Sequence, residues 1–156
     1  MVDFAIESLS TAQPDIERML PAQWAHTGDS EVVCQPNWNL YRQLNERNAA
    51  ILVMARVDGF PVGYLTALVY PHVNAQRELV AEIPTYFVAA GPIRALTLSR
   101  MVDFTLERLA ERGVFKVTIE TSADYSAGKL WELKGFKIAK IGYSLKLKAM
   151  PEVKYA

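Results

Sequence analysis

The sequence is poor in cysteine and histidine and has no long apolar run. Cys34 is the only cysteine, which excludes an internal disulfide bond. His26, His72 and this distant cysteine lack the spacing of metal ligands, so we expect no metal site. The apolar runs are far too short to span a bilayer, and no cationic start followed by an apolar run marks a signal peptide. We therefore expect a soluble, cytoplasmic protein with no membrane partner.

The chain also lacks an excess of either charge. Its 17 lysines and arginines equal its 17 aspartates and glutamates, so no overall field favours an anionic partner. The absence of a basic stripe with interleaved aromatic residues argues against nucleic acid binding. With 156 residues, half of them apolar, the sequence predicts one domain over residues 1–148 and a loose C-terminal tail over residues 149–156.

The stretch over residues 79–113 organises the chain. Residues 79–88 predict a strand, residues 89–95 a short loop, and the following segment an amphipathic helix that Gly113 terminates. Its apolar face is formed by Leu98, Met101, Val102, Leu106 and Leu109. A loop of this kind aims the first N–H groups of the helix at the loop mouth. These groups form a pocket for phosphate-like anions.

The first part of the chain predicts a strand and two helices. Residues 2–6 alternate as in a half-buried strand, and Ser10 or Thr11 offers an N-cap for a helix. Pro14 is expected in the first turn of this helix, and Pro21 is expected to end or bend it. A second helix fits residues 37–48, where Trp38 and Tyr41 share one face. These two rings belong either to the core or to the wall of a substrate cleft.

The middle of the chain predicts an antiparallel meander. Residues 50–57 are apolar on both sides, as in a central strand, and Asp58-Gly59 favours a tight hairpin into a strand over residues 62–70. Gly63 indicates a bulge or a close approach of another strand. In the next strand, residues 79–88, Pro84 requires an unpaired or bulged position.

The last part of the chain predicts two more strands around a short helix. Residues 115–121 alternate as a strand, residues 126–134 form a helix, and Gly135 caps it. Residues 136–147 predict a final strand with a bulge near Ala139-Lys140, because the inward phase changes there.

This order of elements resembles the GNAT superfamily of acyl-coenzyme A N-acyltransferases. The most specific parts are Asp58-Gly59 with PVGY at residues 61–64, the strand-loop-helix at residues 79–113, and LWELKGF at residues 130–136. PNWNLY at residues 36–41 and YPH at residues 70–72 also resemble compact GNAT proteins carried by bacteriophages. The resemblance implies an α+β (α/β) fold with a mixed, mostly antiparallel sheet of about six strands and about four flanking helices.

The resemblance also implies a V-shaped splay between the fourth and fifth strands that binds acetyl-CoA. The pantetheine arm would lie along Phe87, Val88 and Ala89. The pyrophosphate would lie on the backbone of Ile93, Arg94, Ala95, Leu96, Thr97 and Leu98, with Arg94 or Arg100 as cationic partners. The amine, on a protein or a small molecule, would enter from the other side, near the second helix and a loop at residues 71–78.

The chain departs from the family pattern at its most specific positions. The usual glycines of the loop fall at Ile93, Leu96 and Leu98, or at Arg94, Thr97 and Ser99 if the alignment shifts by one residue. The asparagine that commonly contacts the cofactor is Asp124, and the tyrosine often used as general acid is Trp131. Asp124 and Trp131 are nevertheless candidate cofactor contacts.

Two residues are candidates for the proton transfers. Glu82 is the natural base if it faces the cleft, and a solvated strand glutamate otherwise. Tyr143 is expected in the core, where its phenol could also replace the missing acid.

Two functions therefore compete at this point. The first is an acetyl-CoA-dependent N-acetyltransferase, as the fold implies. The second is an inactive GNAT-shaped binding protein, such as a phage factor that docks onto a host protein, as the altered loop, Asp124 and Trp131 suggest. The sequence leaves open whether the protein is a monomer or a homodimer.

Overall fold

The computed structural model describes residues 1–27, 34–121 and 127–148. In these residues five strands form one sheet in the order β1-β2-β3-β4-β5. The strands are β1 (Val2–Ile6), β2 (Ala50–Val57), β3 (Phe60–His72), β4 (Ala75–Val88) and β5 (Val114–Ile119). The helices are α1 (Leu9–Thr27), α2 (Trp38–Glu46), α3 (Arg94–Glu111) and α4 (Gly128–Leu133).

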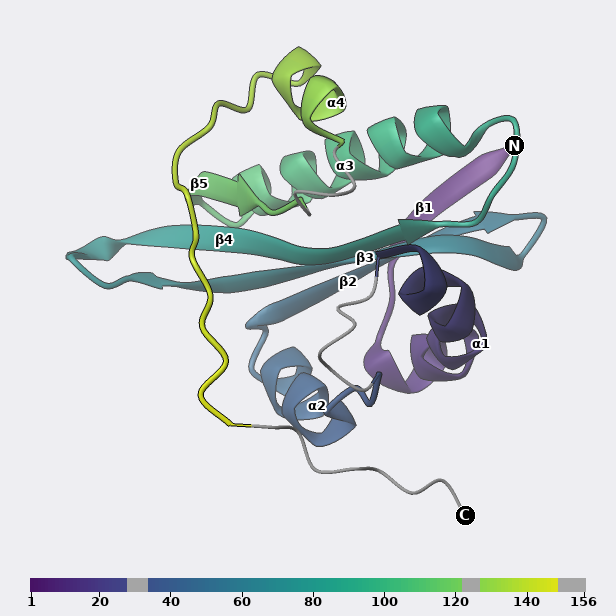
Figure 1. Cartoon of the computed structure of the whole chain (residues 1–156), viewed down its shortest axis with the longest axis horizontal. Helices are drawn as coiled ribbons and strands as arrows, with labels where there is room; N and C mark the ends of the chain where they lie inside the picture. Colours follow the sequence, from purple (N-terminus) through teal and green to yellow (C-terminus); the bar gives the residue numbers. More distant parts are fainter. Residues whose placement is uncertain (28–33, 122–126, 149–156) are drawn as a thin grey trace.

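The helices cover the two faces of the sheet in pairs. Helices α3 and α4 lie on one face, and α1 and α2 lie on the other (Figure 1). The larger core lies under α3 and α4 and includes Ile51, Leu65 and Ile83 of the sheet with Met101 of α3. A smaller core under α1 and α2 is formed by Leu9, Ala12, Ile16, Leu52, Met54, Tyr64 and Phe87. Strand β2 therefore contributes to both cores, as its continuous apolar sequence predicted.

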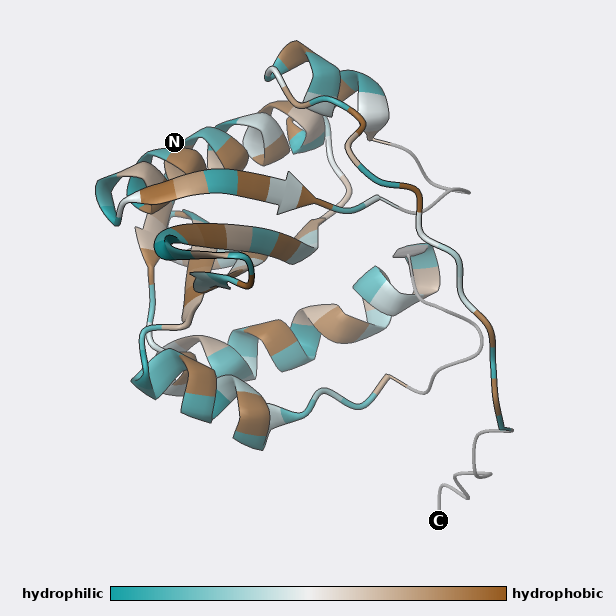
Figure 2. Cartoon of the chain, turned by 90° about the vertical axis from the view of Figure 1, so that its left-hand side faces the viewer, coloured by the Kyte–Doolittle hydropathy of each residue, from teal (hydrophilic) through white to brown (hydrophobic). Residues whose placement is uncertain are grey.

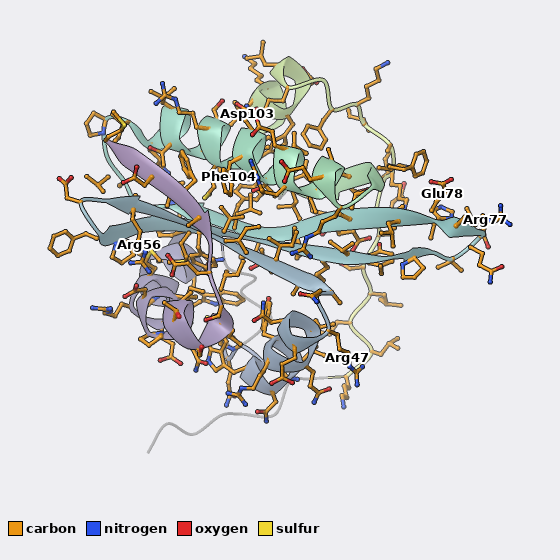
Figure 3. All side chains as sticks on the ribbon, turned by 180° about the vertical axis from the view of Figure 1, so that it is seen from behind. Arg47, Arg56, Arg77, Glu78, Asp103 and Phe104 are labelled. Carbon is orange, nitrogen blue, oxygen red and sulfur yellow. The ribbon has the colours of Figure 1, made fainter. Side chains whose placement is uncertain are left out.

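The turns of the meander follow from local sequence. Asp58 and Gly59 both have positive φ, 49° and 83°, and connect β2 to β3 as the hairpin prediction required. The hairpin between β3 and β4 is longer than predicted, because its strands extend to His72 and begin again at Ala75. The expected loop at residues 71–78 is thus mostly the tip of a hairpin, where Arg77 and Glu78 lie (Figure 3).

The sheet is mixed, as predicted. Strands β4 and β5 are parallel because α3 connects them, and their ladder runs from Leu79 opposite Val114 to Ile83 opposite Ile119. Strand β4 continues beyond this ladder to Val88. The ladder between these strands, where the resemblance implied a V-shaped splay, therefore ends before β4 does.

Pro84 occupies a bulge, as its missing N–H required. Thr66 pairs with Thr85 and Leu68 pairs with Glu82, so Ile83 and Pro84 together oppose the single residue Ala67. The bulge coincides with the parting of β4 from β5. A bulge bends its strand and increases its local twist.

Helix α1 differs from its prediction at both ends. It begins at Leu9, and Ser8 supplies the first acceptors: its carbonyl accepts the N–H groups of Thr11 and Ala12. Ser10 and Thr11 are therefore inside the helix, Pro14 lies beyond its first turn, and Pro21 does not end it. The prediction failed because the helix starts earlier than its polar residues indicated and is held by packing of Leu9, Ala12 and Ile16 on the sheet.

An ionic cluster around Arg56, which Figure 3 labels, fastens α1 to the strands at the edge of the sheet. The guanidinium of Arg56 donates to both carboxylate oxygens of Glu7, at 2.7 and 2.8 Å, and to Asp15 of α1 at 2.8 Å. The hydrogen bond to Glu7 is the largest cause of a raised pKa of Arg56, which burial only partly opposes. A bidentate pair of this kind fixes direction as well as distance.

The predicted final strand is not formed. Residues 136–147 have an extended, alternating sequence, but the structure assigns them to no strand, and residues 137–148 are exposed. They leave α4 and run outside the layers of the fold (Figure 2). An alternating sequence favours a strand, but a strand forms only where another strand pairs with it. The tail at residues 149–156 lies outside the described residues.

Gly63 provides a test of how closely β3 and β4 approach each other. A Cβ at this position would lie 2.6 Å from the carbonyl oxygen of Phe87, a backbone atom that cannot easily move. We expect Gly63→Ala to lower the free energy of unfolding by about 1–3 kcal/mol, as overpacking does. Urea unfolding measures the change.

Gly91→Ala is the matched control, because a Cβ there would meet nothing within 4 Å. Equal stability of the two variants would contradict the close approach of β3 and β4 at Gly63.

Candidate functional site

A cavity of about 280 Å³ lies between α1, α2 and the sheet. Four aromatic rings and several aliphatic side chains form most of its wall, together with uncharged polar groups. The lining residues are Leu9, Ile16, Leu20, Gln23, Trp24, Cys34, Gln35, Pro36, Asn37, Trp38, Tyr41, Asn45, Ala50, Leu52, Tyr64, Thr66 and Thr85. Trp38 and Tyr41, whose role the sequence left open, thus wall a cavity.

Helix α2 is positioned by two asparagines. The side chain of Asn37 accepts the N–H of Leu40 and caps the helix. Asn45, at the other end of the helix, accepts the N–H of Leu9 at 3.3 Å and donates to the carbonyl of Ala50 at 3.4 Å. These bonds hold α2 against both α1 and β2, so the aromatic face of the helix is fixed above the sheet.

The cavity wall is uncharged. No aspartate, glutamate, lysine or arginine is among the described residues that line it. The buried hydroxyl of Tyr64 donates to the side chain of Gln23, and burial raises the pKa of this phenol above its ordinary value. The phenol therefore stays neutral and leaves the cavity without a fixed ion.

Strand β4 connects this cavity to the parting of β4 from β5. Thr85 lines the cavity and lies two residues beyond Ile83, the last residue of β4 in the parallel ladder. Further along, Ala89 donates its N–H to Val62 at 2.8 Å, so backbone groups at Phe87 and Ala89 face β3. By the alternation of an antiparallel strand, the N–H and C=O of Val88 point to the opposite side, where β5 has ended.

The start of α3, which follows β4 after a short loop, also has free backbone donors. Ile93 is the N-cap and has no side-chain capping bond. The N–H of Arg94 bonds to the carbonyl of Gly91 at 3.2 Å, and that of Thr97 to Ile93 at 2.8 Å. Helix geometry therefore leaves the N–H groups of Ala95 and Leu96 without an intrahelical acceptor.

Thr97 and Leu98 are less suited to an anion than the sequence predicted. Thr97 is almost fully buried, and its N–H is already used within the helix. Leu98 packs on the larger core. Ile93 and Leu96, in contrast, are about half exposed, at 49% and 51%. The mouth of the loop is thus rimmed by apolar side chains.

Arg94 bridges α3 to α1. Its guanidinium lies 3.3 Å from Nε2 of His26, near the C-terminal end of α1. The interaction places a cation beside the loop mouth. The other histidine, His72, accepts the N–H of Asn74 at 3.1 Å and so supports the turn of the β3–β4 hairpin.

Glu82 lies on the same sheet face as the cavity. Its neighbours Ala81 and Ile83 belong to the core under α3, so the alternation of the strand turns Glu82 towards the face of α1 and α2. The hydroxyl of Tyr70 donates to its carboxylate at 2.5 Å. This hydrogen bond is the main cause that raises the pKa of Tyr70 to about 12, with smaller contributions from burial and from the charge of Glu82.

The other predicted site residues are not brought to the cavity. Trp131 is buried in the core, where its ring packs edge-on against Tyr86 at 5.2 Å and against Phe136 at 6.3 Å. Tyr143 was expected in the core, and this prediction is wrong, because the side chain is 95% exposed on the unpaired C-terminal segment. Asp124 lies outside the described residues.

The part of the chain that the structure describes contains neither a metal-ligand cluster nor a membrane-spanning helix. No group of three or more histidine, cysteine and carboxylate side chains could hold a metal ion there. No described helix is long and apolar enough to cross a membrane.

Sequence reasoning missed Tyr70 and Thr85. Tyr64, Thr66 and Tyr70 share one face of β3 by simple alternation, which the sequence does show. The pairing of Tyr70 with Glu82 depends on the register of β3 and β4 and on the bulge at Pro84. No local pattern specifies that register to one residue.

Comparisons with known proteins support the fold. No family model and no curated protein matches the sequence. A transcriptional regulator from Bacillus halodurans C-125 has a similar structure, with a TM-score of 0.74 and 18% identity over 94% of this chain and 99% of that one. A ribosomal-protein-alanine N-acetyltransferase from Brucella melitensis gives 0.74 and 20%, over 95% and 99% of the two chains.

A third structure was determined with acetyl-CoA. It is a predicted acetyltransferase from Clostridium acetobutylicum, with a TM-score of 0.69 and 13% identity over 94% of this chain and 97% of that one. The chain therefore has the GNAT acetyltransferase fold, as the order of its elements predicted.

The bond between Tyr70 and Glu82 can be tested by titration. We expect Glu82→Ala to lower the pKa of Tyr70 from about 12 towards its ordinary value of 10.0. Ultraviolet titration of tyrosinate measures it, with Tyr70→Phe identifying the signal. Folding raises this pKa, so the hydrogen bond to Glu82 contributes fully to the stability of the folded state below pH 10.0. That contribution is lost as the pH rises through about 12. An unchanged titration would show that the two groups do not interact.

Proposed function

We propose that the protein is an acetyl-CoA-dependent N-acetyltransferase that acts on an amine. One observation supports this most directly: Thr85 lines the cavity and also belongs to the part of β4 that extends beyond the β4–β5 ladder. An acyl donor in the opening and an amine in the cavity would meet at this residue. Bringing the two reactants together in the right orientation is a major source of rate in acyl transfer.

The donor side offers backbone groups suited to an extended thioester. The N–H and C=O of Val88 point away from β3, beyond the end of the β4–β5 ladder, so a pantetheine amide could pair with them as an added strand would. Ala95 and Leu96 present N–H groups at the start of an 18-residue helix, where an anion is favoured. Acetyl-CoA supplies an activated acetyl group.

The acceptor side favours an amine on an apolar carrier. The cavity has aromatic and aliphatic walls and, among the described lining residues, no carboxylate that would hold a polycation. Trp38 and Tyr41, whose ring centroids are 5.9 Å apart, offer flat apolar surface. We therefore favour a small aliphatic or aromatic amine, or an amine next to an apolar side chain of a protein.

Glu82 is proposed to accept the proton of the amine. Its carboxylate lies on the cavity face of β4, but it is not among the lining residues, so the transfer would pass through one water molecule. Tyr70 donates a hydrogen bond to this carboxylate and orients it. A general acid is less necessary, because a thiol has a pKa of about 8.5 and leaves readily as thiolate.

Acetyl-CoA binding is the first test. Leu96→Glu would place a carboxylate beside the helix N-terminus, where it stabilises the helix but repels phosphates. We expect acetyl-CoA to bind the unmodified protein in calorimetry and to bind Leu96→Glu about tenfold or more weakly, which is 1.4 kcal/mol.

Leu96→Gln is the matched control, because a glutamine side chain has the shape of glutamate without its charge. Equal affinity of the two variants would place the phosphates away from α3. Failure of the unmodified protein to bind acetyl-CoA would favour the alternative, an inactive GNAT-shaped binding protein.

The role of Glu82 is tested by turnover. We expect Glu82→Gln to retain acetyl-CoA affinity and to slow acetyl transfer by roughly 10²–10⁴-fold near neutral pH, as loss of a general base does. The defect should shrink at high pH, because more of the amine is then already neutral.

Glu78→Gln is the control on the same strand, at the exposed tip of the hairpin (Figure 3). Full activity of Glu82→Gln would remove Glu82 from the mechanism.

A further inference from the structure

The sheet side of the cavity carries two threonines on neighbouring strands. Thr66 of β3 lies directly opposite Thr85 of β4 in the antiparallel ladder, and both residues line the cavity. Residues that are paired in this way point to the same face of the sheet, with their Cβ atoms roughly 5 Å apart. Two hydroxyl groups therefore converge on one spot of the cavity floor.

Neither hydroxyl has a hydrogen-bond partner among the described residues, although Thr66 is only 4% exposed. Threonines directly opposite each other often bond together, but no such bond joins this pair. The fully buried Thr105 of α3, in contrast, donates its hydroxyl to the carbonyl of Met101 at 2.8 Å. Most buried polar groups in proteins are paired, so an unpaired hydroxyl in a cavity wall indicates a place for a ligand.

We propose that Thr66 and Thr85 bind a primary amine in its neutral form and orient it. This inference rests on the proposed function, in which the amine enters this cavity. A neutral primary amine has two N–H groups and one lone pair, and each hydroxyl oxygen can accept one of the N–H groups. With both N–H groups bonded to the cavity floor, the lone pair stays free to react.

The position of the pair suits the rest of the proposed reaction. The next pair on the same face is Leu68 and Glu82, two residues along β3 from Thr66 and roughly 7 Å away. One water molecule can connect an amine at the threonines to that carboxylate. Attack by the lone pair forms the N–C bond and breaks the C–S bond of the thioester, whose electron pair stays on sulfur, while one amine proton passes to Glu82.

The pair also predicts which amines bind less well. A neutral secondary amine has only one N–H group, so one hydroxyl would remain unpaired and would face an alkyl group. An unmade hydrogen bond at a buried polar group is costly. A floor with two hydroxyl acceptors therefore selects primary over secondary amines.

Urea unfolding tests whether the hydroxyl is unpaired in the free protein. We expect Thr66→Val, which keeps the shape of the side chain, to leave the free energy of unfolding unchanged or to raise it, because no described partner is lost. Thr105→Val is the matched control and should lower the free energy of unfolding, because it removes the bond to Met101. An equal loss in both variants would overturn the proposal, since Thr66 would then have an internal partner.

Calorimetry without acetyl-CoA tests the amine. Phenethylamine is the primary probe, because its ring suits the aromatic wall, and N-methylphenethylamine is the matched secondary amine. We expect the unmodified protein and Thr105→Val to prefer phenethylamine. Thr66→Val should bind it roughly three- to tenfold more weakly and lose most of that preference.

Two results of this titration would overturn the proposal: no binding of phenethylamine to the unmodified protein, or equal affinity of the unmodified protein and Thr66→Val. Acetyl-CoA affinity is measured separately and should be the same in both proteins. Because the amine is titrated alone, the amine site and the proposed acetyl transfer can fail independently.

Discussion

The parting of β4 from β5 is the constraint on which the rest of the site depends. The ladder stops at Ile83 and Ile119, and the bulge at Pro84, which bends its strand, lies directly beyond it. Backbone groups at Val88 then lie beyond the end of the ladder, and Thr85 enters the cavity wall. Had the ladder continued, these groups would bond to β5, and an extended thioester would have no strand edge to join. The proposed activity therefore depends on backbone groups of β4 that do not pair with β5.

An opening in a sheet is useful only if the strands around it are rigid. Gly63 allows β3 to approach β4 beside Phe87, and the pair between Val62 and Ala89 holds the end of β4 on its other side. The cluster of Arg56, Glu7 and Asp15 fixes α1 over the same face, so the cavity wall keeps its position relative to β4. The site thus lies on well-packed strands and helices, which position groups better than loops do.

The sequence predicted what local patterns determine and missed what tertiary pairing determines. The hairpin at Asp58-Gly59, the bulge at Pro84 and the parallel pair around α3 were predicted correctly, because proline chemistry, positive φ and a helical crossover restrict the alternatives. The bond from Tyr70 to Glu82 was missed, because it requires an exact register. Residues 136–147 have the alternation of a strand but no strand partner in the described chain, and alternation alone does not provide one.

Backbone protection at Val88 tests the central claim most directly. Amide hydrogen exchange is measured residue by residue with and without acetyl-CoA. The account predicts that the N–H of Val88 exchanges more slowly once acetyl-CoA is added, because it gains a partner in the opening. The N–H of Ala89, already bonded to Val62, should be slow in both states. Binding of acetyl-CoA without added protection at Val88 would contradict the account, because the donor would then lie outside the opening between β4 and β5.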